Sequence, residues 1–324
     1  MLNFRVFFQC LAAALCLFAA FSSVSRADAP ARTWTTVSCR SSPGRLQPLI
    51  TVVLNSTTTA TFVLDTGSYV SAVSDTLVKK MGLVPQPYLL AEGRPFILNG
   101  KPLNKVDAAP LGIGEGKTQL AITRYPLAVF AAKELVAING PGVDGIIGTD
   151  LLRFMAVRLD CPQHQVTFWY PGNLTPAELV SDGFGHSLIV PVTDPDHNAL
   201  YYVQGQFQNG LNTATEKMRV DTGISGTFVS PAVASALKLT PDMTGKIDLF
   251  ETTATLFRAK VPSARFGDLT LHDFPIYYYE KEDSANPISL GMDVLSGYRV
   301  LLDYAHGTVY LKPTVPDHIN ILSK

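Results

Sequence analysis

The chain has 324 residues, of which 47% are hydrophobic and 16% charged, and its formal net charge at pH 7 is −1. This length and apolar content predict two domains with separate cores. The balanced charge, with no cluster of Lys and Arg, argues against nucleic acid as a partner.

Residues 1–27 have the pattern of a secretory signal peptide. Arg5 precedes an apolar run that ends at Phe21, and the small residues Ser25 and Ala27 precede the expected cleavage site. We therefore expect a secreted or periplasmic protein, with an uncleaved membrane anchor as the alternative. No later segment is long and apolar enough to span a bilayer, so no stable membrane span is expected after signal removal.

The first clear β pattern is a hairpin, predicted over residues 49–54 and 60–64. It leads directly into the triplet Asp65-Thr66-Gly67. Ser74 stands where it can cap a short helix that follows. Residues 88–143 are rich in Gly and Pro, which predicts longer hairpins in this region.

The second half repeats this order. A hairpin is predicted over residues 200–207 and 216–220, with Asn209-Gly210 as its turn, and it leads into Asp221-Thr222-Gly223. Ser230-Pro231 then opens a matching helix, because proline suits the first turn. A single Asp-Thr-Gly triplet is weak evidence, but two triplets in matching surroundings indicate an internal duplication.

A second pair of motifs strengthens the duplication. Ile146-Ile147-Gly148 returns as Ser289-Leu290-Gly291, and each copy precedes a short Leu-containing stretch. Asp150 and Asp293, which open these stretches, are interpreted as helix caps. Closing hairpins are predicted after both copies, over residues 157–169 and 300–311, with Asp160 and Asp303 as turn residues.

The two triplets and the two apolar-apolar-Gly motifs together resemble the aspartic proteases, both the retropepsin-like and the pepsin-like members. The resemblance covers about residues 46–311 and implies an all-β, bilobal acid-protease fold. Two similar closed-barrel-like β lobes with short helices would meet at the active site. The expected division is a signal peptide (1–27), an N-terminal lobe (28–170), a linker (171–187) and a C-terminal lobe (188–324).

The resemblance also implies a role for each motif residue. Asp65 and Asp221 would be the catalytic pair. The supporting residues would be Thr66 and Thr222, which brace the opposite loop, and Gly67 and Gly223, whose N–H groups bond the carboxylates. Ile147, Gly148, Leu290 and Gly291 would form buried strands beneath the loops.

Two carboxylates about 3 Å apart cannot both ionise, so the pair shares one proton and can activate a water molecule. Ser68 follows the first triplet, and its hydroxyl could donate a hydrogen bond to Asp65. Ile224 follows the second triplet, and its side chain has no donor. We therefore expect Asp65 to ionise first, since a donated bond favours the charged form.

Signal removal leaves two cysteines, Cys39 and Cys161. An even pair in an oxidising compartment suggests a disulfide, and in bilobal aspartic proteases the N-terminal strand lies near the end of the first lobe. A bridge between these cysteines is therefore predicted, with two unpaired buried thiols as the alternative.

By the same resemblance a flap should cover the dyad. Its tip is predicted at Glu92-Gly93 or at Asn99-Gly100, and the second is the stronger hairpin signal. The sequence does not decide between them.

The sequence lacks the motifs of other enzyme classes. The six histidines have no metal-ligand spacing, no Gly-x-Ser-x-Gly elbow is present, and no metal or other cofactor is expected. The predicted function is an aspartic endopeptidase acting on peptides or proteins as a monomer. The alternative is a catalytically inactive peptide-binding protein on the same scaffold.

Overall fold

The fold is taken from a computed structural model, which describes residues 33–42, 44–90, 92–98, 101–114, 120–172, 174–185, 187–192, 200–249, 252–281 and 288–314. The predicted signal peptide, residues 1–27, lies outside the described residues. Within them, no helix has the length and apolar character needed to cross a membrane.

The predicted first hairpin is present. It consists of β2 (Leu49–Leu54) and β3 (Thr58–Leu64), which pair antiparallel. After the first triplet come β4 (Ala72–Ser74) and α1 (Asp75–Lys80). The hydroxyl of Ser74 accepts the N–H of Leu77 at 3.1 Å, so the predicted helix cap is confirmed.

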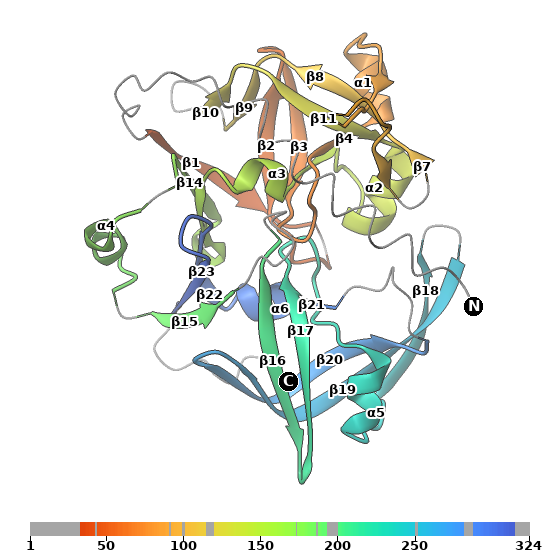
Figure 1. The fold of residues 1–324 in the computed structure, drawn as a ribbon, viewed down its shortest axis with the longest axis vertical. Coiled ribbons are helices and arrows are strands. Elements are labelled where there is room, and N and C mark those ends of the chain that lie inside the picture. Colours follow the sequence, from red (N-terminus) through yellow and green to blue (C-terminus); the bar gives the residue numbers. More distant parts are fainter. Residues whose placement is uncertain are drawn as a thin grey trace.

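The rest of the first half is a set of short strands, drawn from yellow to light green at the top of Figure 1. The strand β12 (Gly145–Ile147) runs parallel to β3 and antiparallel to β4, which places it directly beside the first Asp loop. The remaining elements are β5 (Gln86–Pro87), β6 (Ile97–Leu98), β7 (Lys101–Pro102), β8 (Asn104–Ala108), β9 (Leu111–Ile113), β10 (Leu120–Ile122), β11 (Tyr125–Phe130), α2 (Ala132–Asn139) and β12 (Gly145–Ile147).

The second half forms the lower part of Figure 1 and repeats the arrangement. The predicted hairpin is present as β16 (Tyr202–Asn209) and β17 (Asn212–Val220), and Gly210 in its turn has a φ of 60°. The hydroxyl of Ser230 accepts the N–H of Val233 at 3.3 Å and Pro231 opens the helix, as predicted. The elements are β16 (Tyr202–Asn209), β17 (Asn212–Val220), α5 (Pro231–Ala236), β18 (Met243–Leu249), β19 (Thr252–Phe266), β20 (Leu269–Tyr279), β21 (Ser289–Leu290) and α6 (Met292–Leu295).

A third group of strands connects the halves, at the left of Figure 1. The two predicted closing hairpins, β13 with β14 and β22 with β23, pair with each other through β13 and β22. The predicted linker contains α4. The elements are β1 (Thr33–Arg40), α3 (Thr149–Leu152), β13 (Ala156–Asp160), a 3₁₀ turn (Cys161–Gln163), β14 (Gln165–Tyr170), α4 (Pro176–Ser181), β15 (Leu188–Pro191), β22 (Tyr298–Asp303) and β23 (Thr308–Pro313).

The all-β class is supported, but the predicted closed-barrel-like lobes are not found. The described strands form an open fifteen-stranded sheet with edges at β15 and β5, and an open six-stranded sheet between β18 and β21. The closing hairpins cause this difference, because they pair across the lobes instead of completing a barrel within each lobe. The domain boundaries stay a prediction.

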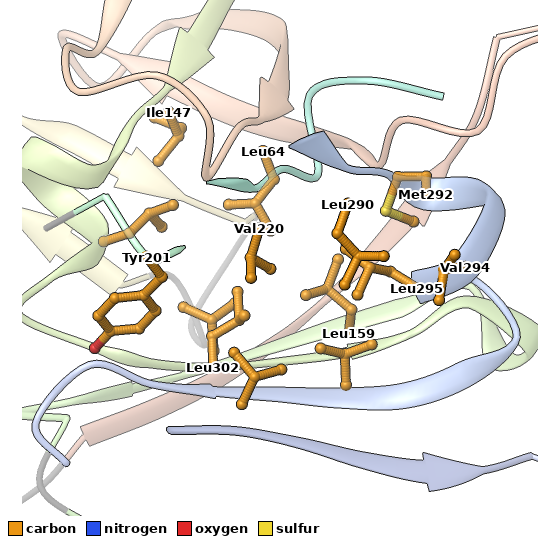
Figure 2. Close-up of a cluster of buried hydrophobic side chains, with 14 of the residues drawn as sticks. Leu64, Ile147, Leu159, Tyr201, Val220, Leu290, Met292, Val294, Leu295 and Leu302 are labelled. Atoms are coloured by element: carbon orange, nitrogen blue, oxygen red, sulfur yellow. The ribbon is translucent and has the colours of Figure 1, made fainter. Parts of the chain in front are cut away.

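A shared apolar core lies directly beneath the junction of the lobes. Leu64 and Val220, the residues immediately before the two triplets, are fully buried and lie near each other in Figure 2. Leu290 from β21 and Leu302 from β22 belong to the same cluster. Because residues from both halves fill this core, the two Asp loops rest on one continuous support.

Candidate active site

The two Asp loops begin in the same way. Asp65 directly follows β3 and Asp221 directly follows β17. The N–H of Asp65 donates to the carbonyl of Ile147 at 3.0 Å, and the N–H of Asp221 donates to the carbonyl of Leu290, also at 3.0 Å. The apolar-apolar-Gly segments thus hold the backbone at the point where each strand ends.

Glycine at the third triplet position brings the carboxylates together. A Cβ added to Gly67 would lie 2.2 Å from Cγ of Asp221, and one added to Gly223 would lie 2.2 Å from Cγ of Asp65. Each carboxyl group is therefore packed against the glycine of the opposite loop. Such reciprocal packing is possible only if the two carboxyl groups face each other across the junction.

The same glycines donate to their own loop. The N–H of Gly67 donates to Oδ1 of Asp65 at 2.8 Å, and the N–H of Gly223 donates to Oδ1 of Asp221 at 2.9 Å. A donated N–H bond favours the ionised form of a carboxylate. Each glycine thus supports one carboxylate electrostatically while leaving room for the other.

The threonines tie the loops across the junction. Thr66 Oγ1 donates to the carbonyl of Val220 at 2.8 Å, and Thr222 Oγ1 donates to the carbonyl of Leu64 at 2.6 Å. Each hydroxyl also accepts the N–H of the other threonine, at 3.1 Å and 3.0 Å. These four buried hydrogen bonds fix the relative position of the two loops.

The hydroxyl contact expected at Asp65 is absent, and a different one is present at Asp221. Ser68 Oγ donates to the carbonyl of Val70 at 2.8 Å. Ser289 Oγ donates to Oδ2 of Asp221 at 3.1 Å. Ser289 therefore supplies the donor that Ile224 cannot provide.

A second residue that sequence reasoning missed is Arg219. Its Nε lies 3.9 Å from Oδ2 of Asp221, and its Nη1 donates to the carbonyl of Gly67 at 3.1 Å. The available signal was strand alternation, which turns a residue two places before Asp221 to the same face as that carboxylate.

The surroundings of Asp65 change the pKa of its carboxyl group. Enclosure by the protein and the charge of Asp221 raise the pKa of Asp65 to about 7, against the opposing effects of the Gly67 N–H and Arg219. The hydroxyl of Ser289 and the guanidinium of Arg219 both approach Oδ2 of Asp221. The pKa of Asp65 is thus raised, and the hydroxyl bond from Ser68 on which the prediction of its early ionisation rested is absent.

Comparison with known proteins supports this arrangement at a coarse level. Residues 203–294 match the family model of aspartyl proteases. The matched segment includes the second triplet and Ser289-Leu290-Gly291. It does not distinguish pepsin-like from retropepsin-like members. No curated protein matches the chain.

Two solved structures are similar in fold. Conglutin gamma, a basic 7S globulin from lupine seeds, has a TM-score of 0.53 at 12% identity, covering 87% of this chain and 95% of that chain. Basic 7S globulin from soybean has a TM-score of 0.49 at 10% identity, with the same coverage of 87% and 95%. At 12% identity, the similarity to conglutin gamma shows a shared bilobal fold and nothing more.

Two further carboxylates, both partly buried, accept hydrogen bonds from the segments that follow the triplets. Asp150 accepts the N–H of Ser71 at 2.9 Å and its hydroxyl at 2.6 Å. Asp293 accepts the N–H of Thr227 at 2.9 Å and its hydroxyl at 2.7 Å. The prediction that they are helix caps is wrong, because the N-cap residues of α3 and α6 are Gly148 and Gly291.

Asp293 gives the fold a pH dependence of unusual sign. Burial raises the pKa of Asp293 to about 6, so the folded state binds its proton more tightly than the unfolded state does. The resulting stability is fully present below about pH 4 and is lost as the pH rises through about 6. We expect Asp293→Asn to remove this contribution, which is worth about 2 kcal/mol between pH 4 and pH 7.

The measurement is urea unfolding of the parent and of Asp293→Asn at pH 4 and pH 7. The carboxyl of Asp107 is the matched control, because the Arg124 side chain lowers its pKa. Stability from Asp107 is present at neutral pH and lost on acidification, so Asp107→Asn should change the pH dependence in the opposite direction. If the free energy of unfolding changes with pH equally in the parent and in Asp293→Asn, the raised pKa of Asp293 is contradicted.

The two cysteines are neighbours, but they are free thiols in this structure. The N–H of Cys39 donates to the carbonyl of His164 at 2.8 Å, next to the turn that begins at Cys161. Burial raises the pKa of Cys39 to about 11 and that of Cys161 to about 12. The predicted bridge is thus not formed here and stays a prediction.

The predicted flap region packs against Tyr69, two residues after the first triplet. The ring of Phe96 lies 6.1 Å from that of Tyr69 and 5.2 Å from that of Tyr88, centroid to centroid. Of the two predicted tips, Gly93 is in a turn with a φ of 75°, whereas Asn99-Gly100 lies outside the described residues, between β6 and β7. The choice between the tips therefore stays open.

In the described part of the chain, no group of three or more His, Cys, Asp and Glu side chains is placed to hold a metal ion. The chemistry that the junction offers is the transfer of a proton between two carboxyl groups and a molecule held between them.

Proposed function

We propose that the protein is an aspartic endopeptidase that hydrolyses peptide bonds with a water molecule activated between Asp65 and Asp221. The observation that carries the proposal is the packing of each carboxyl group against the glycine of the opposite triplet. The carboxyl Cγ would lie 2.2 Å from a Cβ added to that glycine. The threonine bonds across the junction support it, since they hold the carboxyl groups in one geometry.

The contacts of the dyad assign a role to each member. Asp221, next to Arg219 and Ser289, carries the negative charge and removes a proton from the water as it attacks the scissile carbonyl carbon. Asp65 carries the shared proton and donates it to the carbonyl oxygen, which becomes a hydroxyl of the tetrahedral intermediate. Asp221 then protonates the leaving nitrogen, and Asp65 takes the proton of one hydroxyl of the intermediate as the C–N bond breaks and the carboxylic acid product forms.

Because one chain provides both carboxyl groups, the enzyme acts as a monomer in this proposal. Its substrates are peptides or proteins. Residues 1–27 direct it to the periplasm or the exterior through a signal peptide. An acidic pair also suits a compartment where the pH falls below that of the cytosol.

The pKa of Asp65 sets the upper limit of the working pH. Hydrolysis requires Asp65 to be protonated, and its pKa is about 7. We therefore expect kcat/KM to stay high into the mildly acidic range and to fall about tenfold per pH unit above about pH 7. The measurement is cleavage of a mixed peptide library by the mature protein from pH 3 to pH 9, with a statine-containing peptide as inhibitor.

Three results separate the alternatives. Inhibitor-sensitive cleavage that declines above about pH 7 supports the proposal. Cleavage that rises steadily to pH 9 contradicts the role of Asp65. Inhibitor binding without cleavage at any pH favours the second function, a catalytically inactive peptide-binding protein. Conglutin gamma, a globulin of similar fold, shows only that this scaffold is not confined to proteins named as proteases.

A further inference from the structure

A positive charge lies on one side of the dyad. Arg219 is on β17, the strand that leads to Asp221, and its guanidinium contacts both active loops through Asp221 and Gly67. The side chain is 27% exposed, so solvent and substrate can reach it. Among the described residues, Nη1 and Nε have these partners and no acceptor is found for Nη2.

The first lobe has no equivalent charge. The corresponding residue, two places before Asp65, is Val63, which is fully buried. Tyr69 and Ser68, which follow the first triplet, add no charge either. A substrate side chain next to the scissile bond therefore meets a guanidinium on the side of the second lobe and neutral groups on the side of the first.

The balance of charge determines which side chain fits there. A dyad that shares one proton carries one negative charge and would repel an acidic side chain nearby. Arg219 offsets that charge and retains donors that suit a carboxylate in fork geometry. When substrate displaces water from the cleft, this attraction strengthens because the local dielectric constant falls. A lysine or arginine side chain at the same place would be repelled.

We infer that Arg219 determines the substrate specificity of the dyad and selects substrates with an Asp or Glu side chain next to the scissile bond, on the side of the second lobe. The inference rests on the proposed function and names the substrate class of the same site. Its consequence is a one-sided preference, because only one of the two residues that flank the scissile bond lies beside Arg219.

The test uses one peptide cleaved by the parent, remade with Glu, Gln or Lys at each of the two flanking positions. For the parent, kcat/KM should be at least about tenfold higher with Glu than with Gln at one position and equal at the other. Arg219→Gln should bring the Glu-to-Gln ratio close to one. Arg219→Glu should reverse the preference in favour of Lys, and Arg219→Lys should retain part of it.

The ratio is measured within each variant, so a general loss of activity after loosening of the Gly67 contact does not affect it. Lys217→Gln is the matched control. Lys217 lies on the same strand, with its Nζ 4.2 Å from the ring centroid of Tyr202, and its removal changes the net charge equally. The Glu-to-Gln ratio of Lys217→Gln should equal that of the parent.

A second measurement separates this inference from the proposed function. Binding of the same peptides to Asp65→Asn, followed by calorimetry, reports the preference without hydrolysis. A Glu preference that disappears in the Asp65→Asn, Arg219→Gln double variant supports the inference even if the parent cleaves nothing. Equal treatment of Glu and Gln peptides by the parent, a preference that survives Arg219→Gln, or failure of every peptide to bind overturns it.

Discussion

Asp65→Asn and Asp221→Asn are each expected to lower kcat/KM for a cleaved peptide by at least about 10³-fold. Asparagine has nearly the shape of aspartate and its carbonyl oxygen can still accept the N–H of Gly67 or Gly223. It cannot take a proton from water or hold the shared proton. The loss therefore measures proton transfer by the dyad and not the packing of the junction.

The double variant should be no worse than either single variant, because the two groups act as one unit. Asp242→Asn is the control, since Asp242 forms a surface ion pair with Arg258 at 2.8 Å, and its activity should match the parent. Thermal unfolding of all variants at pH 5 checks that the fold is retained. Activity within tenfold of the parent in either single variant would place the chemistry elsewhere.

Features that depend on a few neighbouring residues could be predicted from the sequence. The caps at Ser74 and Ser230, the Asn209-Gly210 turn and the hairpins before both triplets are local, and all are present. The duplicated triplets also identified the two carboxyl groups that meet at the junction. Each cap, turn and hairpin is specified by residues that are neighbours in the chain, where propensity and turn chemistry act directly.

Features that depend on which distant segments meet could not be predicted. Strand alternation predicts a strand but not its partner, so the pairing of β13 with β22, and with it the open sheets, was missed. The hydroxyl on Asp221 comes from Ser289, 68 residues away, and not from the residue after the triplet. The raised pKa of Asp65 is likewise non-local, because it follows from burial at the junction and from the charge of Asp221 in the other half of the chain.

The glycines of the two triplets should tolerate substitution poorly. In Gly67→Ala the new methyl group would lie 2.2 Å from Cγ of Asp221, and in Gly223→Ala 2.2 Å from Cγ of Asp65, whereas real Cβ contacts essentially never fall below 3.0 Å. The carboxyl group cannot rotate away freely, because its own triplet glycine holds it at 2.8 Å or 2.9 Å.

Each alanine variant must therefore push the opposite carboxyl group aside and separate the dyad. We expect kcat/KM to fall by at least about 10²-fold from this displacement and the free energy of unfolding to fall by about 1–3 kcal/mol from overpacking. Gly245→Ala on β18 is the matched control, because a Cβ there meets nothing within 4 Å. Steady-state cleavage and urea unfolding at pH 5 measure both effects. Parent-like activity in Gly67→Ala and Gly223→Ala would show that the carboxyl groups do not pack against the opposite glycines, and the two-carboxylate mechanism would lose its geometric basis.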